Sequence, residues 1–132
     1  MHVLVADDDP AFREVLADLL QDEGLRVSTA GTGDEVLCAV SGDSPDLVLL
    51  DARMPRLEPT AFARAWRAAA GCRSVPVVVI SGLTDVPDPL CGLSAVAPMR
   101  KPFDLDELLE VVAHYCPTAW PRPEPALMTE PR

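Results

Sequence analysis

The sequence predicts an α/β fold in which one parallel sheet is covered by helices on both faces. Five short apolar segments typical of β-strands alternate with roughly five segments that carry apolar residues at helical spacing. The chain has 132 residues, a length typical of a single domain. Because 48% of the residues are apolar and only 5% are aromatic, we expect a core built mainly from Val, Leu and Ala.

The first predicted unit consists of a strand, an acidic loop and a helix. The strand is expected at residues 3–6, and the acidic run 7–9 follows it directly. Pro10 suits the first position of a helix, with Asp9 before it as the N-cap. Apolar residues then recur at helical spacing until Gly24, where we expect the helix to stop.

The next two units repeat this order. A second strand is expected at residues 25–30, and Asp34 should cap the short helix that follows. The third strand, 47–50, is apolar at every position, which is typical of a central parallel strand covered on both faces. Asp51 ends this strand, and an alanine-rich helix should run over about 60–70.

The last third of the chain carries two more predicted strands. The fourth, 75–80, ends at Ser81. Prolines and a glycine within 82–98 oppose a long helix, so we expect the fourth helix to be short or irregular. The fifth strand is expected at 96–100, and Asp104 should cap the final helix.

Two segments define the expected domain organisation. Residues 1–116 should form the folded domain, and residues 117–132 are rich in proline and read as an extended tail. No room is expected for an output domain. The tail could serve as a linker, as a mobile appendage, or as a strap in which Trp120 packs back on the domain.

The charge of the chain restricts its partners. The formal net charge is −10, from 11 basic and 21 acidic side chains. This balance argues against direct nucleic-acid binding, which uses a basic face, and against binding to anionic membranes. The longest strongly apolar stretch is too short to cross a bilayer, and no secretory signal is evident at the N-terminus. We therefore expect a cytoplasmic protein without membrane insertion.

Neither the cysteines nor the histidines form a metal-binding pattern. The cysteines are scattered and include no C-x-x-C pair, which argues against a zinc site or a redox motif; they are Cys38, Cys72, Cys91 and Cys116. We expect them to be buried, reduced thiols. His2 and His114 lack a metal-ligand partner at suitable spacing and are interpreted as structural or surface residues.

Charged and polar residues stand where the predicted strands end. Asp7 and Asp8 follow the first strand, Asp51 the third, Ser81 the fourth and Lys101 the fifth. Because open α/β sheets bind ligands at the carboxyl ends of their strands, we expect one shared crevice there. Alone, each residue could be a helix cap, a turn residue or part of a solvated loop. Their joint occurrence favours a functional site.

Such a crevice calls for a cation. Two carboxylates about 4 Å apart repel by roughly 4 kcal/mol at an effective dielectric constant near 20. Lys101 alone does not neutralise three carboxylates. Magnesium, a hard ion that binds through carboxylates, phosphate oxygens and water, suits such a site better than a softer metal.

These residues resemble the receiver domain of two-component response regulators. Four motifs carry the resemblance, which covers roughly residues 1–116 in order and spacing: Asp7-Asp8, Leu49-Leu50-Asp51-Ala52-Arg53-Met54-Pro55, Ser81-Gly82 and Lys101-Pro102-Phe103. The resemblance implies a flavodoxin-like, doubly wound sheet of five parallel strands in the order 2-1-3-4-5, with helices on both faces.

The resemblance also implies a phosphotransfer site. Asp51 would be the nucleophile that accepts a phosphoryl group from a phosphohistidine on a partner kinase. Asp7, Asp8 and Asp51 would hold Mg²⁺, together with the backbone carbonyl of Arg53. Ser81 and Lys101 would each contact a phosphoryl oxygen.

One position departs from the family pattern. The position three residues before the lysine is typically Tyr or Phe in receivers, whereas here it is Pro98, which has no ring that could swing inward. The output surface is therefore expected to be rebuilt.

Arg53 stands where family members tune the lifetime of the phosphoryl group. We hypothesise that its side chain holds a carboxylate of the empty pocket; the alternative is that it screens the phosphate from water.

Three functions compete. The first is a stand-alone receiver that is phosphorylated by a sensor histidine kinase or a phosphotransfer protein and signals by binding an unidentified protein, with homodimer formation open. It would catalyse its own phosphorylation and dephosphorylation without being a turnover enzyme. The second is a pseudo-receiver, an interaction module with a silent switch. The third is a phosphohydrolase, which Arg53 disfavours because such enzymes carry an acid two residues after the nucleophile.

Overall fold

The computed structural model describes residues 1–43, 45–54, 57–69, 72, 75–82, 86–95 and 98–115. The predicted tail 117–132, with Trp120, and the domain boundary at 116 lie outside the described residues. No helix in these described ranges combines the length and the apolar character needed to cross a membrane.

One parallel sheet of five strands forms the centre of the molecule. Its strand order is β2-β1-β3-β4-β5, which confirms the predicted order. The strands are β1 (His2–Ala6), β2 (Arg26–Ala30), β3 (Leu47–Asp51), β4 (Val77–Ser81) and β5 (Met99–Arg100). The order reverses direction at β1 and β3, so the crevice expected for such a sheet lies at the carboxyl ends of these two strands.

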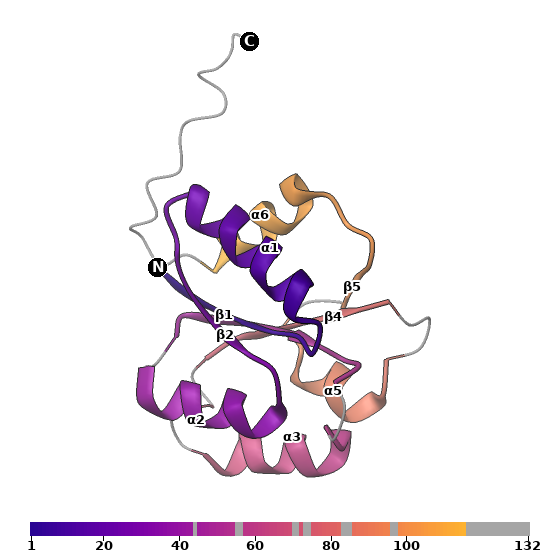
Figure 1. Ribbon diagram of the computed structural model, residues 1–132. Coiled ribbons are helices and arrows are strands. Elements are labelled where there is room, and N and C mark those ends of the chain that lie inside the picture. Colours follow the sequence, from indigo (N-terminus) through magenta and orange to yellow (C-terminus); the bar gives the residue numbers. More distant parts are fainter. Residues whose placement is uncertain are drawn as a thin grey trace, which may run out of the picture.

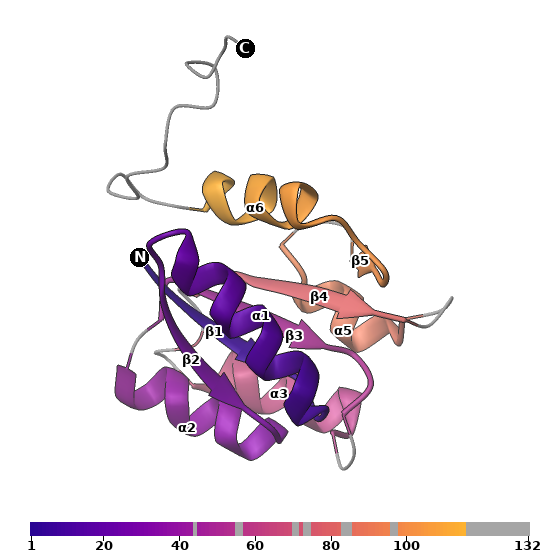
Figure 2. The same cartoon turned by 45° about the horizontal axis from the view of Figure 1, so that its top comes forward.

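Helices cover both faces of this sheet (Figures 1 and 2). They are α1 (Pro10–Asp22), α2 (Gly33–Asp43), α3 (Pro59–Ala68), α5 (Asp88–Leu93) and α6 (Leu105–His114). Figure 1 shows α1 and α6 on one face and α2, α3 and α5 on the other. The short α5 confirms the expectation of a short or irregular element in this part of the chain.

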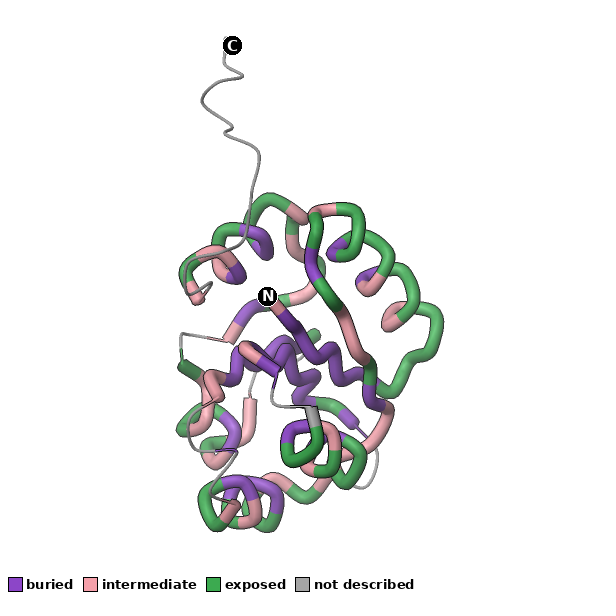
Figure 3. Tube along the Cα trace, turned by 90° about the vertical axis from the view of Figure 1, so that its left-hand side faces the viewer, coloured by how far each residue is buried: buried purple, intermediate pink, exposed green. Residues whose placement is uncertain are grey.

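The core consists of two apolar layers, one on each side of the sheet. Alternate residues of β1 illustrate the division, since Leu4 packs in the layer beneath α2 and α3, whereas Val3 and Val5 pack in the layer beneath α1 and α6. Every residue of β1, β3 and β4 is buried because both faces are covered. Figure 3 shows this as a buried centre surrounded by helices with exposed outer faces.

Two predicted strand starts were early by one or two residues. Leu25 was placed in the second strand, but its N–H donates to the Leu20 carbonyl at 3.2 Å and so completes the end of α1. The fourth strand begins at Val77 and not at Val75. Pro76 has no N–H to donate to a ladder, which makes it a natural boundary. Of the predicted fifth strand, residues 96 and 97 lie outside the described residues.

The predicted cap of α2 was wrong. The Thr32 hydroxyl, and not Asp34, accepts the Glu35 N–H at 3.1 Å, and the Glu35 carboxylate accepts the Gly31 N–H at 2.7 Å. This Thr-x-x-Glu pattern is close to a capping box, which satisfies two free N–H groups at once. Asp34 lies in the first turn, where its charge suits the helix dipole.

The starts of two other helices lie close to where the sequence predicted them, and the structure shows how they are capped. The third helix begins at Pro59, and the Glu58 carboxylate caps it by accepting the Thr60 and Ala61 N–H groups. Asp104 is the N-cap of α6 by position, but its side chain makes no capping hydrogen bond.

The expectation of buried cysteines was wrong for two of the three described ones. Cys72 is buried, and burial raises the pKa of its thiol. Cys38 and Cys91 are exposed, and all three thiols are free. The buried His2 makes a hydrogen bond of 2.7 Å with the Ser28 hydroxyl, which fits its structural interpretation.

Candidate functional site

The predicted site residues meet at the carboxyl edge of the sheet. Asp7 follows β1, Asp51 and Ser81 are the last residues of β3 and β4, and Lys101 follows β5. The strand register sets these ends level, because Asp51 pairs with Ile80 and Ser81 pairs with Arg100. The convergence predicted from the strand ends is therefore confirmed.

Three carboxylates form the acidic part of this site. One oxygen from each of Asp7, Asp8 and Asp51 lies within 4.8 Å of the others. Asp7 and Asp51 are only 2% and 5% exposed, whereas Asp8 is exposed. This set of hard oxygen donors, open to solvent on the Asp8 side, fits Mg²⁺ by its chemistry.

Lys101 reaches into the acidic cluster. Its Nζ lies 2.8 Å from Asp7 Oδ2 and 3.9 Å from Asp51 Oδ2. The backbone N–H of Lys101 donates to the Ser81 carbonyl at 2.8 Å, which ties the start of its loop to the end of β4. The lysine is thus anchored beside the two buried carboxylates and bridges them.

The loop after β1 holds Asp7 in place. The Asp9 N–H donates to Asp7 Oδ1 at 2.9 Å, while the Asp9 carboxylate caps α1 by accepting the Ala11 and Phe12 N–H groups at 3.0 and 3.4 Å. Arg13 Nη1 donates to the Asp7 carbonyl at 2.7 Å. The role of Asp9 as a cap is confirmed. Arg13 was missed, because nothing in its spacing from Asp7 signals a contact made by folding a loop back on a helix.

The electrostatic environment makes Asp51 a weaker acid. Burial raises its pKa above the ordinary 3.8, and the charges of Asp7 and Asp8 raise it further. The Arg53 N–H, which donates to Asp51 Oδ1 at 3.1 Å, and the Lys101 ammonium act in the opposite direction. Because burial and like charges outweigh these two, a bound cation would relieve a real electrostatic cost.

The side chain of Arg53 is exposed. Within the described ranges, its guanidinium forms no ion pair with a carboxylate, and the ion pairs of the acidic cluster are those of Lys101. The structure therefore contradicts the hypothesis that the Arg53 side chain holds a carboxylate of the pocket. A role of the Arg53 carbonyl in metal binding stays a prediction.

Ser81 and Pro98 flank the fifth strand. Ser81 is 1% exposed at the end of β4, next to β5 in the sheet. Pro98 is half-buried and directly precedes β5. The predicted contact of the Ser81 hydroxyl with a phosphoryl oxygen stays a prediction.

Two aromatic residues lie beside Lys101. Phe12 was not predicted as part of the site, and Phe103 was named only as the last residue of the Lys101-Pro102-Phe103 motif. The Lys101 Nζ lies 4.1 Å from the centre of the Phe12 ring. Phe12 and Phe103 meet edge to face, with ring centres 6.4 Å apart and planes at 86°. Phe12 is one of the apolar residues that recur at helical spacing along α1, and only the fold brings it beside the lysine.

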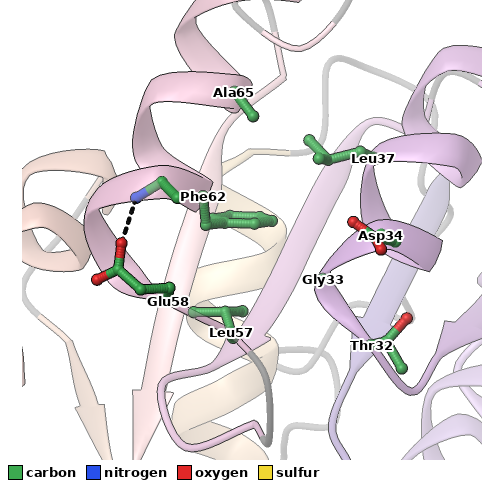
Figure 4. Close-up of a pocket in the computed structure, with 9 residues that line it drawn as sticks. Thr32, Gly33, Asp34, Leu37, Leu57, Glu58, Phe62 and Ala65 are labelled. Carbon is green, nitrogen blue, oxygen red and sulfur yellow. Dashed lines mark hydrogen bonds between the residues drawn. The ribbon is translucent and has the colours of Figure 1, made fainter.

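A separate cleft lies between α2 and α3 (Figure 4). It has a volume of about 380 Å³, and Leu37, Leu57 and Phe62 point into it, as Figure 4 shows. None of the predicted site residues lines it. This cleft is therefore distinct from the acidic site at the strand ends.

Sequence comparisons agree with this site. The family model of the response regulator receiver domain matches residues 3–113. The DNA-binding response regulator MtrA of Mycolicibacterium smegmatis is 38% identical over 110 residues, which are 82% of this chain and 47% of that protein. The response regulator MprA of Mycobacterium avium is 38% identical over 111 residues, 83% of this chain and 48% of the relative. The chain thus spans about half the length of the curated relatives it matches.

Solved structures share the fold. A response regulator receiver protein from Pseudomonas putida has a TM-score of 0.76 at 30% identity, covering 86% of this chain and 95% of the other. The response regulator TrrA of Thermotoga maritima, solved in complex with Mg²⁺-BeF, has a TM-score of 0.75 at 29% identity, covering 87% and 98%. The chemotaxis response regulator CheY4 of Vibrio cholerae has a TM-score of 0.75 at 26% identity, also covering 87% and 98%.

Proposed function

This chain belongs to the family of response regulator receiver domains, and from that membership we propose that it is a signalling module switched by phosphorylation of Asp51. The observation that carries the proposal is the position of the Lys101 ammonium, 2.8 Å from Asp7 and 3.9 Å from Asp51, beside three clustered carboxylates. A nucleophilic carboxylate with a cation next to it is the arrangement that phosphoryl transfer requires.

The proposed reaction forms an acyl phosphate. An Asp51 carboxylate oxygen attacks the phosphorus of a phosphohistidine, the new O–P bond forms as the P–N bond breaks, and the imidazole leaves with the electron pair and takes up a proton. Charge in the transition state spreads over the equatorial phosphoryl oxygens. The Lys101 ammonium and the Ser81 hydroxyl are the proposed donors to these oxygens.

Mg²⁺ is the proposed cofactor. Asp7, Asp8 and Asp51 would hold it, with the Arg53 carbonyl as a further ligand. When bound, it neutralises charge on the transferring group and on the acids. The raised pKa of Asp51 supports this assignment, because burial and the charges of Asp7 and Asp8 leave the Asp51 carboxylate insufficiently compensated.

The proposed partners follow from the reaction. A sensor histidine kinase or a phosphotransfer protein would supply the phosphohistidine in the cytoplasm, and another protein would read the phosphorylated state. DNA binding is a property named for MtrA, and this chain spans about half of that protein. The chain's net charge of −10 argues against direct nucleic-acid binding by the receiver itself.

We propose that the protein acts as a switch and not as a turnover enzyme.

A phosphorylation assay tests the proposal. The full chain is incubated with Mg²⁺ and a small phosphodonor, and intact mass is followed. We expect the mass of one phosphoryl group to be added in the wild type and in Asp18→Asn, an exposed acid of α1 outside the cluster, and not in Asp51→Asn. A wild type that gains no mass while folded contradicts the proposal.

Pro98 favours a second candidate function, the pseudo-receiver. Pro98 stands where receivers carry the aromatic ring that responds to the phosphate. Proline has no such ring, so the output face lacks a side chain that could change position on phosphorylation. Backbone NMR spectra with and without a phosphoryl mimic plus Mg²⁺ separate the two functions. Changes that reach α5 and β5 support the switch, whereas changes confined to the pocket support an interaction module with a silent switch.

A further inference from the structure

We propose that Phe12 is a positioning residue for the phosphotransfer site, and that its ring holds the Lys101 ammonium beside Asp7 and Asp51. The inference rests on the proposed function. Its core is a contact of 4.1 Å between the Lys101 Nζ and the centre of the Phe12 ring. The ring face of phenylalanine carries negative electrostatic potential, so a cation over it is attracted.

A second aromatic ring packs against Phe12. Phe103, two residues after the lysine, meets Phe12 edge to face at 6.4 Å and 86°. These residues and Pro102 border a mostly apolar hollow of about 420 Å³ next to the ammonium. Phe103 thereby supports the orientation in which the face of Phe12, and not its edge, is turned to the cation.

The capped start of α1 links the ring to the acids. Asp9 caps the helix by accepting the Phe12 N–H at 3.4 Å, and its own N–H donates to Asp7 Oδ1 at 2.9 Å. The same residue thus fixes the backbone of Phe12 and the carboxylate of Asp7. The Lys101 ammonium lies between this carboxylate and the ring.

Lys101 needs such support because its side chain is long and 26% exposed. A lysine carries a compact charge on a flexible stem, and water competes for its ammonium. A ring face also has no single acceptor atom, so the ammonium can shift from Asp7 toward a phosphoryl group on Asp51 while it stays over the ring. Phe12 would restrict the lysine without locking it to one carboxylate.

Two variants of Phe12 test this role in the full chain. Phe12→Leu keeps an apolar side chain but removes the ring, and Phe12→Tyr keeps the ring. Val15→Ala, on the same helix and 58% exposed, serves as the control outside the site. The first readout is the NMR shift of the Lys101 side-chain protons in the unphosphorylated protein without Mg²⁺, because protons over a ring face move upfield. The second is the rate of Asp51 phosphorylation by a small phosphodonor with Mg²⁺, which involves no kinase contact.

We expect Phe12→Leu to abolish the upfield shift of Lys101 and to slow phosphorylation about two- to fivefold, the range that corresponds to a partly exposed cation–π contact. Phe12→Tyr and Val15→Ala should keep the wild-type shift and rate. Phe12→Leu with an unchanged Lys101 shift overturns the proposal. Equal slowing by both Phe12 variants with the shift retained also overturns it, since packing alone would then explain the effect. If the wild type is not phosphorylated, the proposed function fails, and the NMR readout still decides whether Phe12 holds Lys101.

Discussion

Lys101 pairs more closely with Asp7 than with the proposed phosphoacceptor Asp51, at 2.8 Å compared with 3.9 Å. The charge of Asp7 acts on Asp51 in the opposite sense to that of Lys101, because it is among the causes that raise the pKa of Asp51. Asp7 therefore weakens Asp51 as an acid twice, by direct repulsion and by attracting the lysine. The ammonium is thus shared unequally between the two acids.

The first prediction concerns Asp7→Asn. We expect the pKa of Asp51 to fall in this variant, because one repelling charge is removed and Lys101 becomes free to approach Asp51. Carboxyl carbon shifts of Asp51, followed by NMR titration without Mg²⁺, measure the change. An unchanged or raised pKa would show that Asp7 does not act on Asp51 in this way.

The second prediction concerns stability and pH. A raised folded-state pKa means that ionised Asp51 costs stability: its contribution favours folding below the ordinary 3.8 and is lost as the pH rises through the raised value. Asp51→Asn should therefore be more stable than the wild type near pH 7 without Mg²⁺, and this advantage should shrink as the pH falls toward 4. Urea denaturation at both pH values checks it, and a pH-independent difference would contradict it.

The third prediction concerns metal binding. Mg²⁺ at ten times its Kd should increase the free energy of unfolding by about 1.4 kcal/mol, because it binds only the folded site. Asp8→Asn should remove most of this gain, since Asp8 supplies one of the three clustered oxygens. Asp18→Asn should keep it. Thermal unfolding with and without Mg²⁺ provides the comparison, and equal gains in all three proteins would place the ion elsewhere.

Much of the site could be predicted from the sequence because its residues lie at the ends of strands or directly after them. Asp51 and Ser81 each close an apolar run, and in a parallel sheet such positions must share one edge. Asp7 and Lys101 follow strands in the same way. The rule needs only the strands and their common direction. It does not depend on where each strand begins, so the early starts predicted for β2 and β4 did no harm.

What could not be predicted depends on contacts between elements. Phe12 has the same helical spacing as any core residue, and only the packing of α1 against the loop after β5 brings it to Lys101. At the start of α2, two candidate caps stand close together. Thr32 is the cap because its hydroxyl accepts the Glu35 N–H while the Glu35 carboxylate accepts the Gly31 N–H. Asp34 then contributes only through the interaction of its charge with the helix dipole.

The fourth prediction compares two caps. Asp9→Ala should cost about 1 kcal/mol of stability, because the Asp9 carboxylate accepts two N–H groups at the start of α1. Asp104→Ala is the matched control, since Asp104 holds the same position on α6 without a side-chain hydrogen bond. Asp104→Ala should lower the free energy of unfolding by only a few tenths of a kcal/mol, about the contribution of a negative charge near the positive end of the helix dipole. Urea denaturation of both variants measures the difference, and equal losses would mean that the capping bonds of Asp9 add nothing.

The fifth prediction uses two glycines in different backbone conformations. Gly24, just after α1, has a φ of +90°, and nothing lies within 4 Å of a Cβ added there. Gly24→Ala should therefore cost about 1–2 kcal/mol from backbone strain alone. Gly42, inside α2, is also without neighbours within 4 Å and has no such φ. Gly42→Ala should instead stabilise the protein by about 0.5 kcal/mol, because alanine loses less freedom on entering a helix. The two changes in the free energy of unfolding, measured in urea, must have opposite signs. If they share a sign, backbone conformation does not decide the effect at these positions.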